Sequence, residues 1–442
     1  MPASASPLPQ TLARRPSAFI VFVQAGTLGY NLVLMTRIRL LHLADLHIGM
    51  ENYGRLDPAT GVNGRVLDFL DRFDKVIDYG LEREVDLVIF AGDAFKTRNP
   101  TPTYQRAFAR RVKRLADAGV PVLLLVGNHD LPTMVQRASS VDIFRTLEVS
   151  NVLVGRDERL HHVETRHGPV QIATVPYPVR QRLLVNDEYR GLSIEQLDEA
   201  LRHIVTGNIE ALARQLDPQV PAVLAAHLSV SGATFGSERS VMIGRDAVVL
   251  KSALADPAWD YVALGHVHKH QSLNDDGHPP VVYAGSLERI DFGEEEQPKG
   301  FCWVELARGE TTWEFVEVDA RRFVTVRADV RDALNPLMAL QQVVAAHDLR
   351  DAVVRLILHL RADQEPLVRD RDVRALLSDA YFVGGINREV EREARVRLGS
   401  LAPEEMTDHE LLAKYLETKN TDPEQIKVLL EHAEEIFAGE SD

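Results

Sequence analysis

Five nearly continuous apolar runs in this sequence end abruptly in aspartate, asparagine or histidine. They are Leu40–Ala44, Leu87–Ala91, Val122–Val126, Ala222–Ala226 and Tyr261–Leu264. Apolar runs of this length predict strands that are buried on both faces. Amphipathic patterns with helical spacing separate several of these runs, at Arg65–Glu84, Tyr104–Ala118 and Glu195–Leu216. The alternation of strands and helices predicts right-handed crossovers and stacked α/β layers.

Side chains with oxygen or imidazole lone pairs follow directly after these five runs. They are Asp45, His47, Asp93, Asn128, His227, His266 and His268. Because loops at strand ends carry the chemistry of such sheets, we expect all seven to converge on one rim. Carboxylate, amide and imidazole ligands without a thiolate fit Mn²⁺, Fe²⁺ or Zn²⁺. Seven donors are too many for one ion and suit two ions that share a bridging carboxylate.

The order of these motifs resembles that of the calcineurin-like metallophosphoesterases. Asp-x-His, Gly-Asp, Gly-Asn-His-Asp, a single His and Gly-His-x-His follow one another from Asp45 to His268, and all five are intact. The flanking segments ADLHIGMENYG, AGDAFKTRNPTP and AGSLERIDFGEEEQPKGF are similar to one branch, the SbcD-type nucleases of SbcCD DNA-repair complexes. The resemblance implies an α/β fold in which a four-layer β-sandwich is flanked by helices, with a small α+β capping domain and a C-terminal helical tail.

The resemblance also implies the role of each ligand. It assigns one divalent ion to Asp45, His47 and His268, a second to Asn128, His227 and His266, and a bridging position to Asp93. Mn²⁺ is the ion that this branch implies.

Four further residues are candidates for catalysis or substrate binding. By resemblance, His129 stabilises the transition state or protonates the leaving oxygen. Asp130 either orients His129 or only shapes its loop. Lys96 either contacts a DNA phosphate or is a surface lysine, and Arg289 either contacts phosphate or pairs with an acidic side chain.

Composition restricts the partners of this chain. It has 442 residues, a net charge of −15 and a single cysteine, Cys302. A DNA-binding protein usually gathers Lys and Arg against phosphates, so this charge argues against tight DNA binding by the chain alone and is compatible with a partner that supplies basic surface. One cysteine excludes an internal disulfide framework and indicates a reducing compartment, which predicts a cytoplasmic protein.

Residues 1–34 do not fit the rest of the chain. Arg14 and Arg15 precede a short apolar run from Ala18 to Val23. We favour a start codon placed too far upstream, with Met35 as the true beginning. A secretory signal and a membrane anchor are the alternatives, but polar residues interrupt the run, and we expect no membrane association.

Three segments follow this extension. Residues 35–320 are predicted to form the nuclease domain. Residues 321–391 alternate strands with helices and are predicted to form a small domain, which the resemblance implies is a DNA-binding cap. Residues 402–438 carry two amphipathic helices, which either fold back on the body or bind another protein. The resemblance implies that they hold the coiled coil of an SbcC-type ATPase, in a heterotetramer that contains a homodimer of this chain.

The function predicted from these features is that of a metal-dependent DNA nuclease in DNA repair. The resemblance implies a 3′-to-5′ exonuclease on double strands and an endonuclease on single strands, with a two-metal mechanism. A small-molecule phosphodiesterase or phosphatase is the first alternative, although such enzymes rarely need a cap and a helical tail. A non-catalytic scaffold is the second, although a relic site should have lost some ligands.

Overall fold

The computed structural model describes residues 37–132, 137–184, 187–236, 246–275, 277–392, 407–419 and 421–439. The extension at residues 1–34 lies outside the described residues. The described chain forms two compact units. The first comprises the described residues up to Val326 together with Ala346–Leu356 and Leu377–Ile386, and the second comprises Arg327–Ala345, Ile357–Leu376 and the described residues from Asn387 onward.

Two six-stranded sheets form the body of the first unit. The first sheet has the order β12 (Thr312–Glu317), β11 (Gly300–Leu306), β1 (Ile38–Leu43), β2 (Leu87–Phe90), β3 (Val122–Leu125) and β4 (Val152–Gly155). The second has the order β5 (Arg159–Thr165), β6 (Gly168–Val175), β7 (Ala222–His227), β8 (Tyr261–Gly265), β10 (Val281–Tyr283) and β9 (Gln271–Ser272). Strands β1 to β4 are parallel, as are β6, β7, β8 and β10. The carboxyl ends of the central strands therefore meet at one edge of each sheet.

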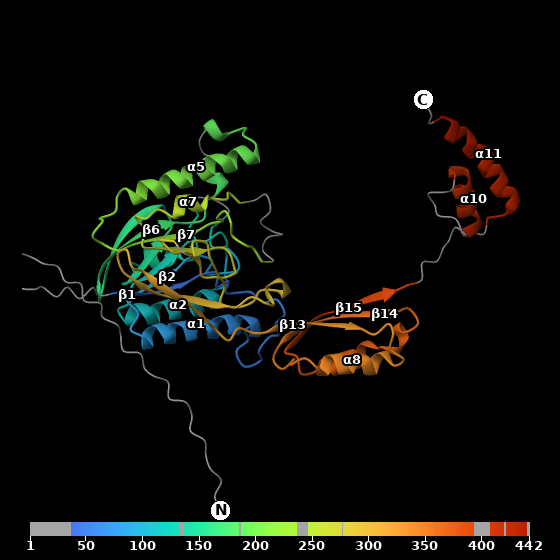
Figure 1. The fold of residues 1–442 in the computed structure, drawn as a ribbon, viewed down its shortest axis with the longest axis horizontal. Helices are drawn as coiled ribbons and strands as arrows, with labels where there is room; N and C mark the ends of the chain where they lie inside the picture. The colour runs from blue at the N-terminus through green and yellow to red at the C-terminus, as the bar shows by residue number, and fades with distance from the viewer. Residues whose placement is uncertain are drawn as a thin grey trace, which may run out of the picture. The chain divides into compact units, whose positions relative to one another are not determined.

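Alternate residues of each central strand enter different cores. In β1, Leu41 packs in a core with α1 (Gly64–Glu82) and α2 (Pro102–Asp117), whereas Leu40 packs in a core between the two sheets. In β7, Leu224 packs in a core with α5 (Ile194–Ala213) and α7 (Lys251–Leu254), and Val223 packs between the sheets. The resulting helix, sheet, sheet and helix layers are visible in Figure 1, with α1 and α2 on one side and α5 and α7 on the other. These layers confirm the predicted fold class.

The helices begin where the sequence supplies caps. Helix α2 starts at Pro102, two residues before the predicted start, because the Thr101 side chain caps it and proline needs no hydrogen-bond partner for its nitrogen. Shorter elements complete the first unit, namely α3 (Asp142–Thr146), α4 (Arg180–Leu183), η1 (Asp187–Tyr189) and η2 (Phe292–Glu294). Within the described ranges, none of the helices is both long enough and apolar enough to span a lipid bilayer.

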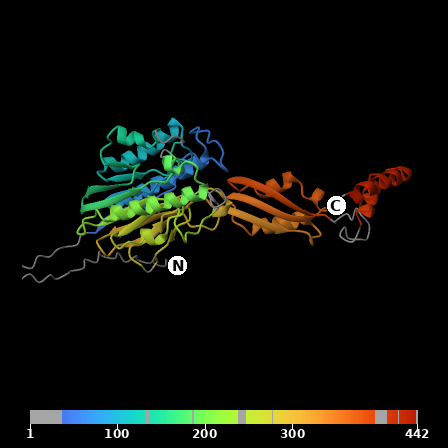
Figure 2. The same ribbon diagram turned by 90° about the horizontal axis from the view of Figure 1, so that it is seen from above.

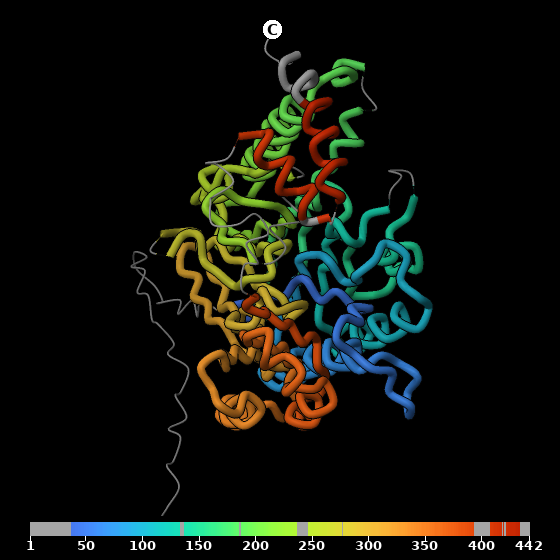
Figure 3. Tube along the Cα trace, turned by 90° about the vertical axis from the view of Figure 1, so that its right-hand side faces the viewer, coloured from blue at the N-terminus to red at the C-terminus, as the bar shows by residue number. Residues whose placement is uncertain are grey.

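The C-terminal part of the chain follows the predicted order of elements. Strands β13 (Phe323–Asp329), β14 (Val353–Arg361) and β15 (Phe382–Glu391) form a three-stranded sheet, drawn in orange in Figure 2. Between these strands in sequence lie α8 (Pro336–Ala345), η3 (Glu365–Leu367) and α9 (Asp370–Leu376). Helix α10 (Asp408–Thr418) packs against α11 (Pro423–Gly439), and the two lie side by side in Figure 3. The domain boundaries and roles of residues 321–391 and 402–438 stay predictions.

Candidate metal centre

All seven predicted ligands lie at the carboxyl ends of the central strands. The ligands Asp45 and His47 follow β1, Asp93 follows β2, Asn128 follows β3, His227 ends β7, and His266 and His268 follow β8. Six of these side chains are buried and that of Asn128 is half-buried. The structure thus brings together residues that are up to 223 positions apart in the sequence.

Left-handed backbone conformations turn these side chains into the rim. The φ angles are 52° at Asp45, 46° at His47, 60° at Asp93 and 97° at His266. A residue other than glycine pays about 1–3 kcal/mol for such a conformation, which persists only where the surrounding structure enforces it. Gly92, with φ of 99°, lies so close to His227 that a Cβ atom would come within 2.3 Å of the imidazole Nδ1. The glycine of the Gly-Asp motif is therefore required by close approach.

Asp45, His47 and His268 form one group of ligand atoms, all within 4.8 Å of one another. The Nε2 atoms of His47 and His268 face each other at 3.0 Å. Among the described residues, the buried Nδ1 of His47 has no hydrogen-bond partner. The Nδ1 of His268 donates to Glu294 at 2.9 Å, so its Nε2 presents a lone pair. Two facing imidazole nitrogens beside a carboxylate are an arrangement that a divalent cation satisfies.

Asn128, His227 and His266 form a second group. The Oδ1 atom of Asn128 lies 3.0 Å from His227 Nε2 and 2.9 Å from His266 Nδ1. The other nitrogen of each ring has a partner outside the group. His227 Nδ1 donates to the Ala91 carbonyl at 2.7 Å, and His266 Nε2 contacts Asp246 at 2.7 Å. Both rings therefore direct their remaining nitrogen toward the Asn128 oxygen, where a cation would be held by one oxygen and two nitrogens.

Asp93 lies between the two groups. Its Oδ2 atom is 3.7 Å from His47 Nε2 in the first group and 3.5 Å from His227 Nε2 in the second. Its Oδ1 atom accepts a hydrogen bond from the backbone N–H of His129 at 2.8 Å. This position fits a carboxylate that two metal ions share.

The carboxylates around His227 favour a positive charge at that ring. Burial by itself lowers the pKa of the His227 ring, but Asp93, with a contribution from Asp45, outweighs burial and raises that pKa to about 9. Carboxylates that stabilise a proton on a fully buried imidazole also stabilise a metal cation at the same place. The donor set contains oxygen and nitrogen without sulfur, so the residues present fit divalent ions such as Mn²⁺.

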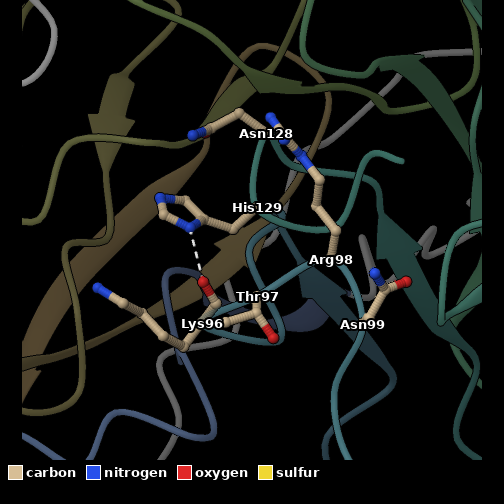
Figure 4. Close-up of a pocket in the computed structure, with 6 residues that line it drawn as sticks. All are labelled: Lys96, Thr97, Arg98, Asn99, Asn128 and His129. Atoms are coloured by element: carbon tan, nitrogen blue, oxygen red, sulfur yellow. Dashed lines mark hydrogen bonds between the residues drawn. The ribbon is translucent and has the colours of Figure 1, made fainter. Parts of the chain in front are cut away.

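His129 stands beside this centre and lines a cavity. The cavity, of about 560 Å³, is lined by Lys96, Thr97, Arg98, Asn99, Asn128 and His129 (Figure 4). The His129 Nδ1 atom donates to the backbone carbonyl of Lys96 at 2.9 Å, and its ring meets that of His47 edge-on with centroids 4.8 Å apart. Within the described part of the chain, its Nε2 atom has no hydrogen-bond partner. That nitrogen is therefore available to a bound substrate.

In the described part of the chain, the hydrogen bonds of the Asp130 side chain go to backbone N–H groups and not to the His129 ring. The buried Asp130 carboxylate accepts hydrogen bonds of 2.9–3.3 Å from the backbone N–H groups of Asp93, Ala94, Phe95 and Gly127. These bonds tie the loop after β2 to the loop after β3. The structure favours the loop-shaping alternative for Asp130, and His129 is oriented by the Lys96 carbonyl instead.

We expect Asp130→Asn to destabilise the protein. The amide would turn its N–H₂ group toward backbone N–H donors, and a buried N–H group left without an acceptor costs about 1–3 kcal/mol. The thermal unfolding midpoint, measured in EDTA, should fall well below that of wild type, whereas Asp117→Asn on the exposed end of α2 should leave it unchanged. An Asp130→Asn protein as stable as wild type would contradict this role.

Comparison with known proteins agrees with this geometry. The profile of the calcineurin-like phosphoesterases matches residues 38–270, a span that contains all seven ligands. The chain belongs to this family. The resemblance seen in the sequence is thereby confirmed, and the chain is a hydrolase of phosphoesters.

Individual relatives of this phosphoesterase differ in how much they share with it. The SbcD component of the nuclease SbcCD from Bacillus subtilis (strain 168) is 28% identical over 291 residues, which cover 63% of this chain and 69% of that protein. A dimetal phosphatase from Danio rerio is 11% identical, with 64% of this chain and 96% of that chain covered and a TM-score of 0.36. A purple acid phosphatase from yellow lupin is 12% identical, with 64% and 52% covered and a TM-score of 0.39.

The two predicted substrate-binding cations of the phosphoesterase lie in different environments. Lys96 is half-buried at the cavity, where burial lowers the pKa of its ammonium group. Arg289 is engaged by the protein itself, because its guanidinium donates to the backbone carbonyls of Glu294, Glu295, Gln297, Ala320 and Arg321. For Arg289 the geometry favours a structural role over phosphate binding.

Two carboxylates that contact ligand histidines of the phosphoesterase were not predicted from the sequence. Glu294 accepts from His268, and Asp246 lies 2.7 Å from His266. Burial by itself raises the pKa of both carboxyls. Lys299 and His268 outweigh burial at Glu294 and hold its pKa below the usual range. At Asp246, His266 and the neighbouring hydroxyls lower the pKa to about 2. Glu294 lies in the segment AGSLERIDFGEEEQPKGF, whose similarity to one family branch was a usable signal. Nothing in the sequence around Asp246 distinguishes it.

Proposed function

We propose that this phosphoesterase is a DNA nuclease that uses two divalent ions, with Mn²⁺ as the preferred metal. The observation that carries the proposal is the convergence of two ligand groups on either side of Asp93, next to His129 and a cavity lined by polar side chains. The name of the Bacillus subtilis relative supports a nuclease over a phosphatase.

In this proposal the protein holds both ions through side chains already in position. Asp45, His47 and His268 would hold one ion, Asn128, His227 and His266 would hold the other, and Asp93 would serve both. When bound, two such ions polarise the phosphoryl group and lower the pKa of a bound water to near neutrality.

The proton transfer belongs to His129. Because its Nδ1–H is fixed by the Lys96 carbonyl, Nε2 is the atom that holds or releases a proton toward the leaving oxygen. The backbone N–H of His129 is bonded to Asp93, so the histidine keeps a constant position relative to the metal ligands. Asp130 fixes the same two loops from behind.

The side chains that line the cavity suit a substrate with several phosphate groups. Lys96 and Arg98 line it, and in the described part of the chain neither has a recorded ion pair, although the chain carries a net charge of −15. Thr97 and Asn99 add a hydroxyl and an amide beside them. A nucleic-acid strand supplies flanking phosphates for these groups, whereas a small phosphodiester reaches only the metal centre. This difference favours DNA over a small-molecule substrate.

We expect Arg98→Ala to weaken DNA cleavage selectively. Loss of one phosphate contact should raise the KM for DNA and reduce the salt dependence of binding by about one unit in the slope of log K against log salt. Hydrolysis of bis-p-nitrophenyl phosphate should not change, because this diester has no flanking phosphate. Arg110→Ala on the exposed face of α2 is the matched control. Equal losses on both substrates would contradict a phosphate contact.

The specific nuclease activities that we propose are those of the SbcD-type branch. We propose 3′-to-5′ exonuclease activity on double strands and endonuclease activity on single strands, in the cytoplasm and in DNA repair. Residues 321–391 would cap the nuclease site and contact DNA.

The exposed apolar side chains of helices α10 and α11 are consistent with a binding site for a partner protein. They expose Tyr415, Val428 and Leu429 by 54%, 52% and 46%. Exposed apolar side chains on a helix pair suit binding to another protein. We propose an SbcC-type coiled-coil ATPase at these helices, in a heterotetramer that contains a homodimer of this chain.

The test is cleavage of a hairpin-ended DNA duplex in Mn²⁺ or EDTA, with and without a co-expressed SbcC-type ATPase. Bis-p-nitrophenyl phosphate serves as the generic diester. We expect Mn²⁺-dependent cleavage of DNA that the partner increases. Hydrolysis of the generic diester without DNA cleavage, even with the partner, would favour a small-molecule enzyme. Partner binding without any hydrolysis would favour a scaffold.

A further inference from the structure

Behind His268 lies an ion pair that the surrounding fold buries completely. Glu294 and Lys299 are both 0% exposed, and Lys299 Nζ lies 2.8 Å from Glu294 Oε2. The desolvation of two charges can exceed their mutual attraction, so stability alone does not explain such a pair. Its contacts indicate what else it does.

The pair holds both ends of His268. Glu294 Oε1 accepts from the ring Nδ1 at 2.9 Å, and Lys299 Nζ donates to the His268 backbone carbonyl at 3.2 Å. Lys299 also donates to Ser286 Oγ at 2.9 Å, and the Ser286 backbone N–H donates to the same His268 carbonyl at 3.1 Å. The ring and the backbone of one histidine are thus fixed by one buried unit.

The other histidine of the same motif has a separate support. His266 contacts Asp246, which accepts hydrogen bonds from the hydroxyls of Tyr177 and Ser229. None of these contacts involves Glu294 or Lys299. Each half of the metal centre therefore has its own carboxylate behind its own histidine.

We propose that the Glu294–Lys299 pair positions His268 and thereby sets the affinity for one metal ion only, the ion held with Asp45 and His47. The hydrogen bond to Glu294 keeps the proton on Nδ1 and the lone pair of Nε2 toward the ion. Because Lys299 offsets the charge of Glu294, the pair adds little net charge at the ion and acts through its hydrogen bond to the ring, which a carboxylate accepts more strongly than a neutral amide does. This inference rests on the proposed two-ion centre.

The experiment measures Mn²⁺ stoichiometry and affinity by calorimetry, with electron paramagnetic resonance to count bound ions. Wild type should bind two ions. Glu294→Gln should weaken one of them by about 10–100-fold and leave the other unchanged. Because Glu294→Gln removes the negative charge beside the buried ammonium group of Lys299, the double variant Glu294→Gln/Lys299→Met is measured too, and it should show the same selective loss. Thermal unfolding in EDTA confirms that each variant is folded.

Asp246→Asn provides the matched comparison. It should weaken the ion that Glu294→Gln spares, and combining the two changes should weaken both ions. A folded double variant that binds both ions as wild type does would overturn the proposal, as would loss of the same ion in Asp246→Asn and Glu294→Gln. Fewer than two ions on wild type would instead overturn the proposed two-ion function itself, and this inference with it.

Discussion

Asp93→Asn should lower kcat/KM for both DNA and bis-p-nitrophenyl phosphate by about 10³-fold or more. Asp93 Oδ2 lies between the two ligand groups, 3.7 Å from His47 Nε2 and 3.5 Å from His227 Nε2. An amide has no negative charge and one ligand oxygen, so it cannot bridge two cations as a carboxylate does. Metal ions contribute several kcal/mol to the transition state, and about 4 kcal/mol corresponds to a loss of about 10³-fold.

The Asp93 prediction is checked by kcat/KM and by Mn²⁺ stoichiometry on the same preparation. Asp117→Asn is the control, because Asp117 is an exposed aspartate at the end of α2. We expect the Asp93→Asn protein to stay folded, since the backbone N–H of residue 93 still donates to Asp130. Two bound ions with activity near that of wild type would show that Asp93 is not the bridge.

His129→Gln should lower kcat while leaving both metal ions bound. A positioned general acid contributes about 10²–10⁴-fold, and glutamine has no proton to transfer at this place. The KM should change little, because the metal ligands and the cavity remain. Retained metal binding is the informative part, since the His129 ring lies close enough to His47 and Asp93 to be a ligand itself. Loss of an ion in His129→Gln would show that His129 is itself a metal ligand.

The choice of leaving group separates an acid from a general stabiliser. p-Nitrophenolate leaves without protonation, whereas the alkoxide of a DNA sugar requires a proton. If His129 is the acid, His129→Gln should reduce DNA cleavage far more than hydrolysis of bis-p-nitrophenyl phosphate. Equal reductions would favour stabilisation of the charged transition state. His162→Gln, at an exposed position of β5, controls for the substitution itself.

The sequence by itself determined the layers and the set of residues at the rim. Residues alternate between the two faces of a strand, so an apolar run such as Leu40–Ala44 predicts burial on both sides. Parallel strands bring their carboxyl ends to one edge, and this made it possible to expect Asp45, Asp93 and His227 together from their positions alone. The structure brings all seven predicted ligands to that edge.

Only the tertiary structure decided which neighbours the loop residues meet. The sequence left two roles open for Asp130, and the backbone N–H groups around its carboxylate favour one of them. The sequence left Arg289 either to contact phosphate or to pair with an acidic side chain, and in the structure its guanidinium donates to five backbone carbonyls. Glu294 reaches His268 across 26 positions of chain. The physical reason is the same in each case: strand periodicity fixes the direction of side chains within an element, whereas the path of a loop depends on contacts with distant parts of the chain.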